Sequence, residues 1–454
     1  MGMPDARRAA APPSADLTMY LHYAAARLAG WLRPARPKRV ASPAETKPAE
    51  PGISVVIPSR NGRGLLEAQL PGIVRDLAVG EIIVVDNGSE DGTADWLAAR
   101  WPAIAVEISA QPLSFARAVN RGIARARCSL VCLLNNDMLL EPGFFRALTE
   151  AFEKVPDLFC ATAQIRFPAG ARREETGKAV MAQTRATDFP VRCDEPLPGE
   201  DLTFVLYGSG GCSVYDAAKL RALGGADESY QPAYVEDLDL GYRAWLRGWP
   251  TVYVAGALVE HRHRATTSRY YTDQELDTIL EVNYLKFLAR AVSSRKVFGR
   301  LWARALRRLT VLGTPSARAA LRAAARIAIS GGPAATTDES EEMVLALTDG
   351  SVACFPGVQP TGMPRRVVFC ESLEEAFREP AAGCDWILVA MVDRLATPPA
   401  NLLAQYIEIT LVRRPPGSTA APLAFHAALG QVHRKWRPAI FYNELFQSET
   451  NPRT

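Results

Sequence analysis

The first half of the chain repeats one pattern, in which a short continuous apolar run precedes a stretch with apolar residues every three or four positions. The apolar runs are ISVVIP from Ile53, EIIVVD ending at Asp86, AIAVEIS from Ala103 and SLVCLLNND ending at Asp137. Continuous apolar runs are typical of strands covered on both faces, and the longer periodicity is typical of helices. The alternation predicts a Rossmann-like α/β domain with parallel strands and helices over 65–77, 115–126 and 143–152. Its ligands should gather at the carboxyl ends of the strands.

The pattern weakens beyond residue 155. Charged and turn residues predominate over 155–215, and helical periodicity returns at 237–246 and 274–291. After a linker-like segment at 329–340, a hairpin is predicted around Asp349-Gly350, followed by a strand, a helix and a strand. We therefore expect four parts: a flexible lead-in with a short amphipathic helix over 1–52, the α/β domain over 53–292, basic amphipathic helices over 293–330, and a small α/β domain of unknown function over 341–450.

Residues 295–312 combine helical apolar spacing with positive charge. The apolar positions are Phe298, Leu301, Trp302, Ala305, Leu309 and Leu312, and Lys296, Arg300, Arg304, Arg307 and Arg308 fill others. Between 290 and 327 there are ten Arg or Lys and no acid. Two interpretations are open: the apolar face docks on the protein and the cations are solvated, or the helix adheres to an anionic membrane surface.

Composition narrows the class of protein. The chain has 454 residues, 48% apolar and 22% charged, with a net charge of +3, so nucleic acid is not expected as a partner. The eight cysteines lie mostly in apolar runs, as in a reducing compartment. The apolar stretch from Leu17 to Leu32 is interrupted by His22 and Arg27 and no cleavage site follows it. We expect a cytoplasmic protein, with peripheral contact to the inner face of the cytoplasmic membrane as the open alternative.

Two strand ends carry groups that could bind a nucleotide. The carboxylate of Asp86 could accept hydrogen bonds from a ribose hydroxyl or a nucleobase imide, or it could form an Asx turn or cap the next helix. Asn135 and Asp137 present two oxygen donors suited to Mg²⁺ or Mn²⁺, the alternative being a polar turn. No GxGxxG or GxxxxGK[ST] phosphate loop occurs at a strand-to-helix junction.

Two further groups lie in the second half of the domain. Glu236 and Asp237 begin a predicted helix, where a carboxylate could act as a general base at a pocket mouth or merely suit the helix dipole. His261 and His263 follow a strand-like run two residues apart, so they face one side if the strand continues. They are either metal ligands or surface polar residues.

Taken together, these segments resemble family 2 glycosyltransferases of the GT-A fold, especially bacterial rhamnosyltransferase-like and galactofuranosyltransferase-like members. The resemblance spans about 53–290 and rests on SVVIPSRNG at 54–62, EIIVVDNGSEDGT at 81–93, FARAVNRGIARA at 115–126, LLNNDMLLEPGF at 133–144, YGSGGCSVYDAAKLRALGGADESY at 207–230, VEDLDLGYRAWLRGW at 235–249 and EHRHRATTS at 260–268.

The resemblance implies roles for individual residues. Donor contacts would come from Pro58, Asp86, Asn120, Asn135, Asn136, Gly210 and Gly211. Asp137 and His261 would bind the metal together with Asn135, and His263 is the fallback. Asp237 would be the catalytic base, and Glu236 would support it or contact the acceptor. Two departures from the family pattern are Asn135, a neutral ligand at the first D-x-D position, and the loop QPLSFARAVN, which lacks the glycines usual before Asn120.

The activity implied is inverting transfer of a sugar from a dTDP- or UDP-linked donor to a hydroxyl of a bacterial surface glycan. The acceptor would be a glycan or a lipid-linked glycan, and the cofactor Mg²⁺ or Mn²⁺. One alternative is a non-catalytic nucleotide-sugar-binding or scaffold protein of the same fold. A sugar nucleotidyltransferase is a third possibility, but it requires a Gly-rich, basic loop after the first strand, and PSRNGRG is short for that purpose.

Overall fold

A computed structural model describes residues 17–33, 49–155, 157–168, 176–181, 183, 185–262, 269–330, 341, 344–345, 352–356, 366–370, 372–377 and 386–414. The chain divides into two compact units. One is helical and consists of residues 1–39, 185–188 and 272–338, and the other contains the remaining segments and all the sheets. In this division the helix over 273–290 belongs to the same unit as the basic helices over 295–330.

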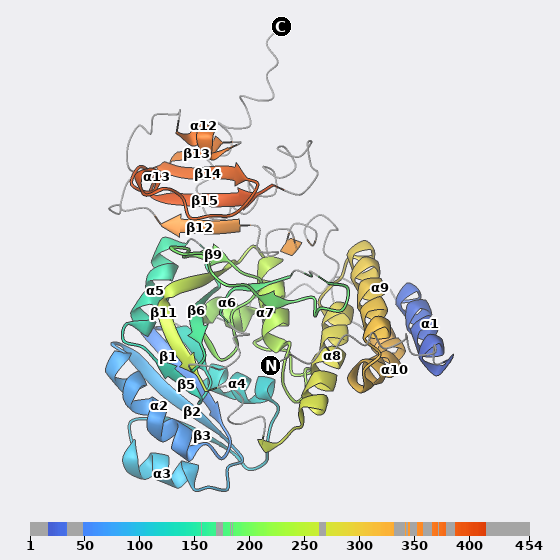
Figure 1. Ribbon diagram of the computed structural model, residues 1–454. Coiled ribbons are helices and arrows are strands. Elements are labelled where there is room, and N and C mark those ends of the chain that lie inside the picture. Colours follow the sequence, from blue (N-terminus) through green and yellow to red (C-terminus); the bar gives the residue numbers. More distant parts are fainter. Residues whose placement is uncertain are drawn as a thin grey trace, which may run out of the picture. The chain divides into compact units, whose positions relative to one another are not determined.

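A nine-stranded sheet forms the centre of the larger unit, in the order β3-β2-β1-β4-β10-β6-β11-β5, with β9 also paired to β11 (Figure 1). Its strands are β1 (Glu50–Ser59), β2 (Gly80–Asn87), β3 (Ala105–Ser109), β4 (Cys128–Leu134), β5 (Met138–Leu140), β6 (Cys160–Arg166), β9 (Thr203–Phe204), β10 (Cys212–Asp216) and β11 (Thr251–His261). The short strands β7 (Ala179–Val180) and β8 (Arg192–Cys193) pair separately.

The first four strands run parallel, as the alternating pattern predicts. The other half of the sheet is mixed, because β10 is antiparallel to both β4 and β6, and β5 is antiparallel to β11. Apolar runs show that a strand is buried but carry no information about its direction. The direction of β5 matters for function, since it places the segment after β4 beside the end of β11.

Helices cover both faces of this sheet. They are α2 (Arg63–Asp76), α3 (Thr93–Arg100), α4 (Phe115–Arg125), α5 (Phe144–Lys154), α6 (Ala217–Ala222) and α7 (Glu236–Trp245). Successive residues from Ser54 to Ile57 are buried, which requires covering on both sides because neighbouring side chains point to opposite faces. One apolar core joins the central strands to α4, α6 and α7, with Val56, Val131 and Leu240 among its members.

A separate four-stranded sheet has the order β12-β15-β14-β13. Its elements are β12 (Val352–Pro356), β13 (Arg366–Cys370), α12 (Leu373–Ala376), β14 (Trp386–Val392), α13 (Ala400–Leu403) and β15 (Glu408–Arg413). The predicted strand, helix and strand correspond to β13, α12 and β14. The hairpin expected around Asp349-Gly350 lies outside the described residues, and β12 pairs with β15.

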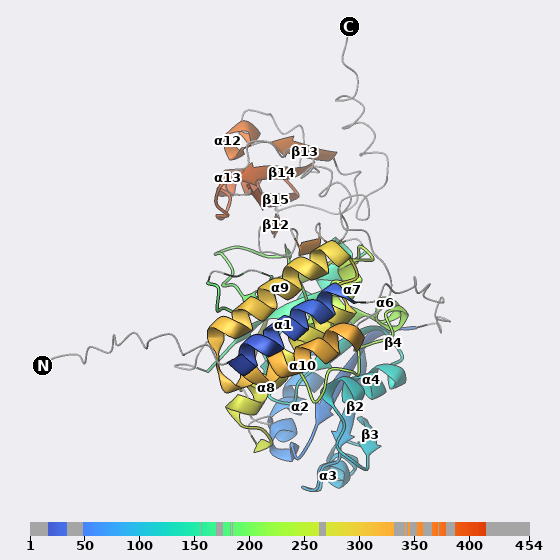
Figure 2. The same ribbon diagram turned by 90° about the vertical axis from the view of Figure 1, so that its right-hand side faces the viewer.

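Four helices form the helical unit: α1 (Leu17–Trp31), α8 (Asp273–Arg290), α9 (Arg295–Leu312) and α10 (Pro315–Ser330). Figure 2 shows α1 lying over α9 and α10, and all three pairs of these helices are in contact. The α8 helix begins with a capping box formed by Thr272 and Glu275. No helix in the described parts of the chain is long and apolar enough to cross a membrane.

One of the α9 cations that was expected to be solvated is buried instead. Arg308 is buried, and its guanidinium forms two hydrogen bonds with the carboxylate of Glu281 in α8. The apolar residues Phe298, Trp302 and Leu309 are also buried, so α9 docks its apolar side within the helical unit. Arg308 is therefore part of the packing between α8 and α9.

Candidate active site

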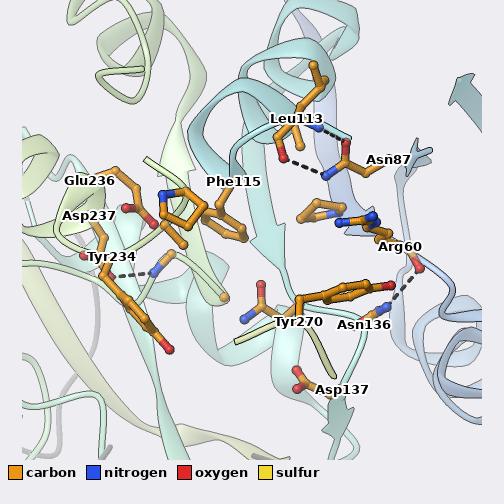
Figure 3. Close-up of a pocket in the computed structure, with 18 of the residues that line it drawn as sticks. Arg60, Asn87, Leu113, Phe115, Asn136, Asp137, Tyr234, Glu236, Asp237 and Tyr270 are labelled. Atoms are coloured by element: carbon orange, nitrogen blue, oxygen red, sulfur yellow. Dashed lines mark hydrogen bonds between the residues drawn. The ribbon is translucent and has the colours of Figure 1, made fainter. Parts of the chain in front are cut away.

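One pocket gathers residues from separate segments at the carboxyl ends of β1 and β4 (Figure 3). Its lining contains Pro58 and Ser59 at the end of β1 and Arg60 after it, Asn135, Asn136 and Asp137 after β4, Ser209, Gly210 and Gly211 before β10, Glu236 and Asp237 in α7, and His261 at the end of β11. Figure 3 shows Glu236 and Asp237 on one wall and Asp137 and Asn136 on another. Three of the four groups identified in the sequence thus contribute to one cavity, and Asp86 does not line it.

The pairing of β5 with β11 brings Asp137 and His261 together. His261 lies opposite Met138 in the antiparallel register, and the N–H of Arg262 donates to the carbonyl of Asp137 at 2.9 Å. The Nε2 atom of His261 is then 3.5 Å from Oδ1 of Asp137, and both side chains are only 8% exposed. A carboxylate and an imidazole this close offer two ligands to one divalent cation.

The oxygen of Asp137 that faces His261 is suited to a cation. This Oδ1 atom is buried and accepts no hydrogen bond from the described part of the chain. A buried carboxylate oxygen without a donor is costly, and a bound cation would compensate it. Among the described residues no cluster of three His, Cys, Asp or Glu side chains could hold a metal, so within those residues the site provides two strong protein ligands.

The two asparagines before Asp137 are held by neighbours of β1 and β10. Asn136 donates from Nδ2 to Oγ of Ser59 at 2.9 Å, and the Asn135 N–H donates to the carbonyl of Gly211 at 2.7 Å. The buried Gln69 of α2 donates from Nε2 to the carbonyls of Asn135 at 2.5 Å and Met138 at 2.8 Å. These bonds hold the backbone on both sides of Asp137.

The glycine pair before β10 permits a close approach of backbone to this segment. A Cβ added at Gly211 would lie 2.4 Å from Nδ2 of Asn135, which is closer than side chains approach in proteins. The N–H of Gly210 donates to Oδ2 of Asp237 at 3.3 Å. Gly211 therefore leaves room for Asn135, and Gly210 contacts the candidate base.

The two carboxylates of α7 have different environments. Asp237 accepts from the Leu238 N–H at 2.8 Å as well as from Gly210, and it faces the pocket. Glu236 is 6% exposed, and its Oε2 has no hydrogen-bond partner among the described residues. Burial, followed by the nearby charge of Asp237, raises the pKa of Glu236 well above its ordinary value. The neutral form of Glu236 is therefore favoured beside Asp237.

Two residues assigned to the donor by resemblance do not line this pocket. Asp86 is buried at the end of β2, and its Oδ1 accepts the Ser89 N–H at 3.2 Å, which is the Asx-type interaction weighed from the sequence. Asn120 in α4 donates to the carbonyl of Ala226 and to Glu228, and accepts the Ala226 N–H. Pro58 does line the pocket, and His263 lies outside the described residues.

Sequence reasoning missed an aromatic and basic part of the lining. The guanidinium of Arg60 lies 4.1 Å from the ring centre of Tyr270, and Asn61 donates from Nδ2 to the Tyr270 hydroxyl at 2.9 Å. Phe115 and Tyr234 also line the cavity. The signal available was the Tyr270-Tyr271 pair following the histidine segment, but its position depends on a contact more than 200 residues away in sequence.

Residues 51–276 match the model of the family described as glycosyltransferase like family 2. This match covers the nine-stranded sheet apart from Glu50, its helices and every residue that lines the pocket. The chain carries a family 2 glycosyltransferase domain. The glycosyltransferase domain has the mixed α/β sheet and strand-end pocket expected of the GT-A fold, which confirms the family and the fold class inferred from the motifs.

Relatives of known sequence are consistent with this domain assignment. The N-acetylglucosaminyl-diphospho-decaprenol L-rhamnosyltransferase of Mycobacterium tuberculosis H37Rv is 28% identical over 212 residues, which cover 41% of this chain and 68% of that protein. An uncharacterized protein of Sinorhizobium fredii is 25% identical over 253 residues, covering 52% of this chain and 27% of that protein. The family and the first relative support sugar transfer to a glycan acceptor.

Solved structures with a similar arrangement are more distant. A mannosyltransferase from Pyrobaculum calidifontis, in complex with GDP-Man and Mn²⁺, has a TM-score of 0.40 and 16% identity, covering 72% of this chain and 88% of that chain. GalNAc-T7 with UDP, GalNAc and Mn²⁺ has a TM-score of 0.44 and 16% identity, covering 54% of this chain and 49% of that chain.

Proposed function

We propose that the glycosyltransferase domain transfers a sugar from a dTDP- or UDP-linked donor to a hydroxyl of a surface-glycan acceptor, with inversion at the anomeric carbon. The observation that carries the proposal is the arrangement of Asp137, His261 and Asp237 around one pocket. The sequence relationship to a rhamnosyltransferase that acts on a diphospho-decaprenol-linked sugar supports a hexosyl or rhamnosyl donor and a lipid-linked glycan acceptor.

Asp137 and His261 are the residues proposed to hold Mg²⁺ or Mn²⁺, with Asn135 as a weaker neutral ligand. Their fit to a cation rests on the 3.5 Å approach of His261 Nε2 to Asp137 Oδ1 and on the absence of a donor to that oxygen within the described residues. When held by these residues, a divalent cation would supply positive charge opposite the diphosphate leaving group. The Asn136 amide and the backbone of Gly211 would position the donor beside it.

Asp237 is the proposed base. Its two backbone hydrogen bonds hold the carboxylate towards the pocket, on a different wall from Asp137 (Figure 3). From there it can remove the proton of an acceptor hydroxyl as that oxygen attacks the anomeric carbon. One displacement on the face opposite the leaving group inverts the configuration, and Glu236 would assist by remaining neutral, because two adjacent carboxylates do not both ionise readily.

Donor binding and turnover can be tested with the purified chain. A panel of dTDP- and UDP-sugars with Mn²⁺ should identify the donor by thermal shift, since a ligand at 100 times its Kd adds about 2.7 kcal/mol of stability. The donor so found should then be hydrolysed slowly without acceptor, and transferred to a lipid-linked glycan when one is supplied. Stabilisation by a donor without any turnover would instead identify a non-catalytic nucleotide-sugar-binding protein.

The metal assignment needs a matched comparison. Asp137→Asn should weaken Mn²⁺ binding in the presence of the nucleoside diphosphate, whereas Glu260→Gln should not. Glu260 precedes His261 on β11, so its side chain points to the other face of the strand, and it does not line the pocket. Equal Mn²⁺ affinity in the two variants, measured by titration calorimetry, would contradict the proposed ligand set.

A further inference from the structure

The helix α1 presents most of its large apolar residues to solvent, and its fully buried positions are small residues. Leu17, Tyr20, Leu21, Leu28, Trp31 and Leu32 are between 57% and 72% exposed. The buried positions of the helix are Ala26 and Ala29. A surface helix normally buries its apolar stripe, so this orientation is the reverse of the usual one.

Contacts with α9 hold α1 in this orientation. The indole N–H of Trp302 donates to the carbonyl of Ala26 at 3.0 Å. A Cβ added at Gly30 would lie 2.7 Å from the Trp302 ring, so only glycine allows the two helices to approach this closely. Because the contact depends on small residues of α1, a rotation that buried Leu21 or Trp31 there would lack space.

The outward residues form one continuous stripe. Positions 17, 20, 21, 28, 31 and 32 fall within roughly a third of the circumference at 3.6 residues per turn. The stripe contains a tryptophan and a tyrosine, the side chains that favour the boundary between lipid headgroups and acyl chains. A helix of 15 residues is about 22 Å long, which is too short to span a bilayer but suits a position in its surface.

The charge around the stripe is uniformly positive. The helices α1, α9 and α10 together contain ten Arg or Lys residues and no Asp or Glu. A cavity between α1 and α9 is lined by Arg27, Trp31, Arg33 and Arg295, next to the apolar stripe. Such a setting complements phosphate groups, and it disfavours a second copy of this chain, which would bring the same cations to the contact.

We propose that α1 lies in the surface of an anionic phospholipid bilayer, with its outward stripe among the acyl chains and the arginines of the helical unit at the headgroups. The apolar contribution to membrane binding then comes from α1, because the apolar side of α9 is already buried within the helical unit. The inference is independent of the proposed reaction. It concerns only the helical unit shown in Figure 2.

The test is co-sedimentation of the full chain with vesicles of phosphatidylcholine alone or mixed with phosphatidylglycerol. The wild type should bind the anionic vesicles, and the variant Leu21→Gln/Leu28→Gln/Trp31→Gln should bind on the order of tenfold more weakly. The matched control is Val74→Gln/Val79→Gln/Ile108→Gln, which changes three exposed apolar residues of the other unit and should bind like the wild type.

Charge is tested separately. Arg300→Gln/Arg304→Gln/Arg307→Gln changes exposed cations of α9 and should weaken binding to anionic vesicles, most at low salt. Circular dichroism must show that each variant is folded. If the triple apolar variant melts early, Trp31→Gln alone takes its place.

Three results would overturn the proposal. The wild type could fail to bind anionic vesicles, or the apolar variant could bind as tightly as the wild type. Light scattering could also show a dimer that the apolar variant converts to a monomer while vesicle binding is absent, which would assign the stripe to a second copy of the chain.

Discussion

Replacing Asp237 by asparagine separates chemistry from binding in the glycosyltransferase domain. The amide has almost the same shape as the carboxylate but cannot accept a proton at neutral pH. If Asp237 removes the acceptor proton, Asp237→Asn should lose transfer while the donor still binds. Donor affinity should be preserved because the proposed diphosphate contacts lie on a different wall, at Asp137 and Asn136 (Figure 3).

The structure indicates the size of each effect. The Asp237 carboxylate accepts backbone N–H groups from Leu238 at 2.8 Å and Gly210 at 3.3 Å. An asparagine keeps one of these bonds and turns its NH₂ group towards the other donor, at a cost of about 0.5–1.5 kcal/mol of stability. Loss of general-base catalysis typically lowers a rate by about 10²–10⁴, equivalent to about 2.7–5.5 kcal/mol in the barrier. The rate effect should therefore exceed the structural one.

The assay is single-turnover transfer from the identified donor, with the donor Kd measured by calorimetry on the same samples. The neighbouring Glu236→Gln variant is the control, because it also removes a carboxylate from α7 but should retain most activity if Glu236 works in its neutral form. Transfer by Asp237→Asn within a few fold of the wild type would refute the assignment. So would a loss in Glu236→Gln as large as that in Asp237→Asn.

Three further predictions concern stability. Gly211→Ala should cost about 1–3 kcal/mol and weaken donor binding, because its methyl group would overlap Asn135. For Glu236 the pKa in the folded state is raised above 4.5. Its contribution to stability is therefore full below that pH and falls as the pH rises through the folded-state pKa. Glutamine does not titrate, so the melting temperature of Glu236→Gln should exceed that of the wild type increasingly at higher pH. Arg308→Met should cost about 3–5 kcal/mol by leaving Glu281 buried without its cation, measured by urea unfolding of the full chain.

A control tests the physical reason given for each of these three stability predictions. Gly64→Ala adds a methyl group where nothing lies within 4 Å, so it should not reduce stability. A constant melting difference between wild type and Glu236→Gln across the pH range would show that the glutamate does not carry its proton into the folded state. The double change Glu281→Leu/Arg308→Met should recover most of the loss seen in Arg308→Met, since both charges are then absent.

Much of the fold follows from local sequence. The apolar runs before Asp86 and Asn135 are the strands β2 and β4, and the periodic stretches that follow β2 and β3 are the helices α3 and α4, because apolar periodicity reflects burial directly. The direction of the later strands could not be predicted this way. The antiparallel placement of β10 depends on which edge of β4 is free and on the path of the chain, neither of which is encoded in a short apolar run.

In the site, too, the sequence predicted some features of each residue and the tertiary structure decided others. Asn120 and Asp86 have chemistry suited to a donor. In the structure Asn120 bonds Ala226, 106 residues away in the sequence, and Asp86 accepts the Ser89 N–H of its own turn. Tyr270 and Arg60 came together without a motif that joins them. Side-chain type thus indicated what a residue could do, and packing determined what it contacts.

The amino-acid sequence by itself determined the strands, the helices and the polar strand ends, because burial and turn formation depend on neighbours within a few positions. Tertiary structure alone decided that His261 lies beside Asp137, through the register of β11 against β5, two segments more than 100 residues apart. It also decided that α1 turns Leu21 and Trp31 outwards, because Trp302 packs against Gly30. Both outcomes depend on contacts between segments that are distant in the sequence. The free energy of such contacts cannot be read from a local sequence pattern.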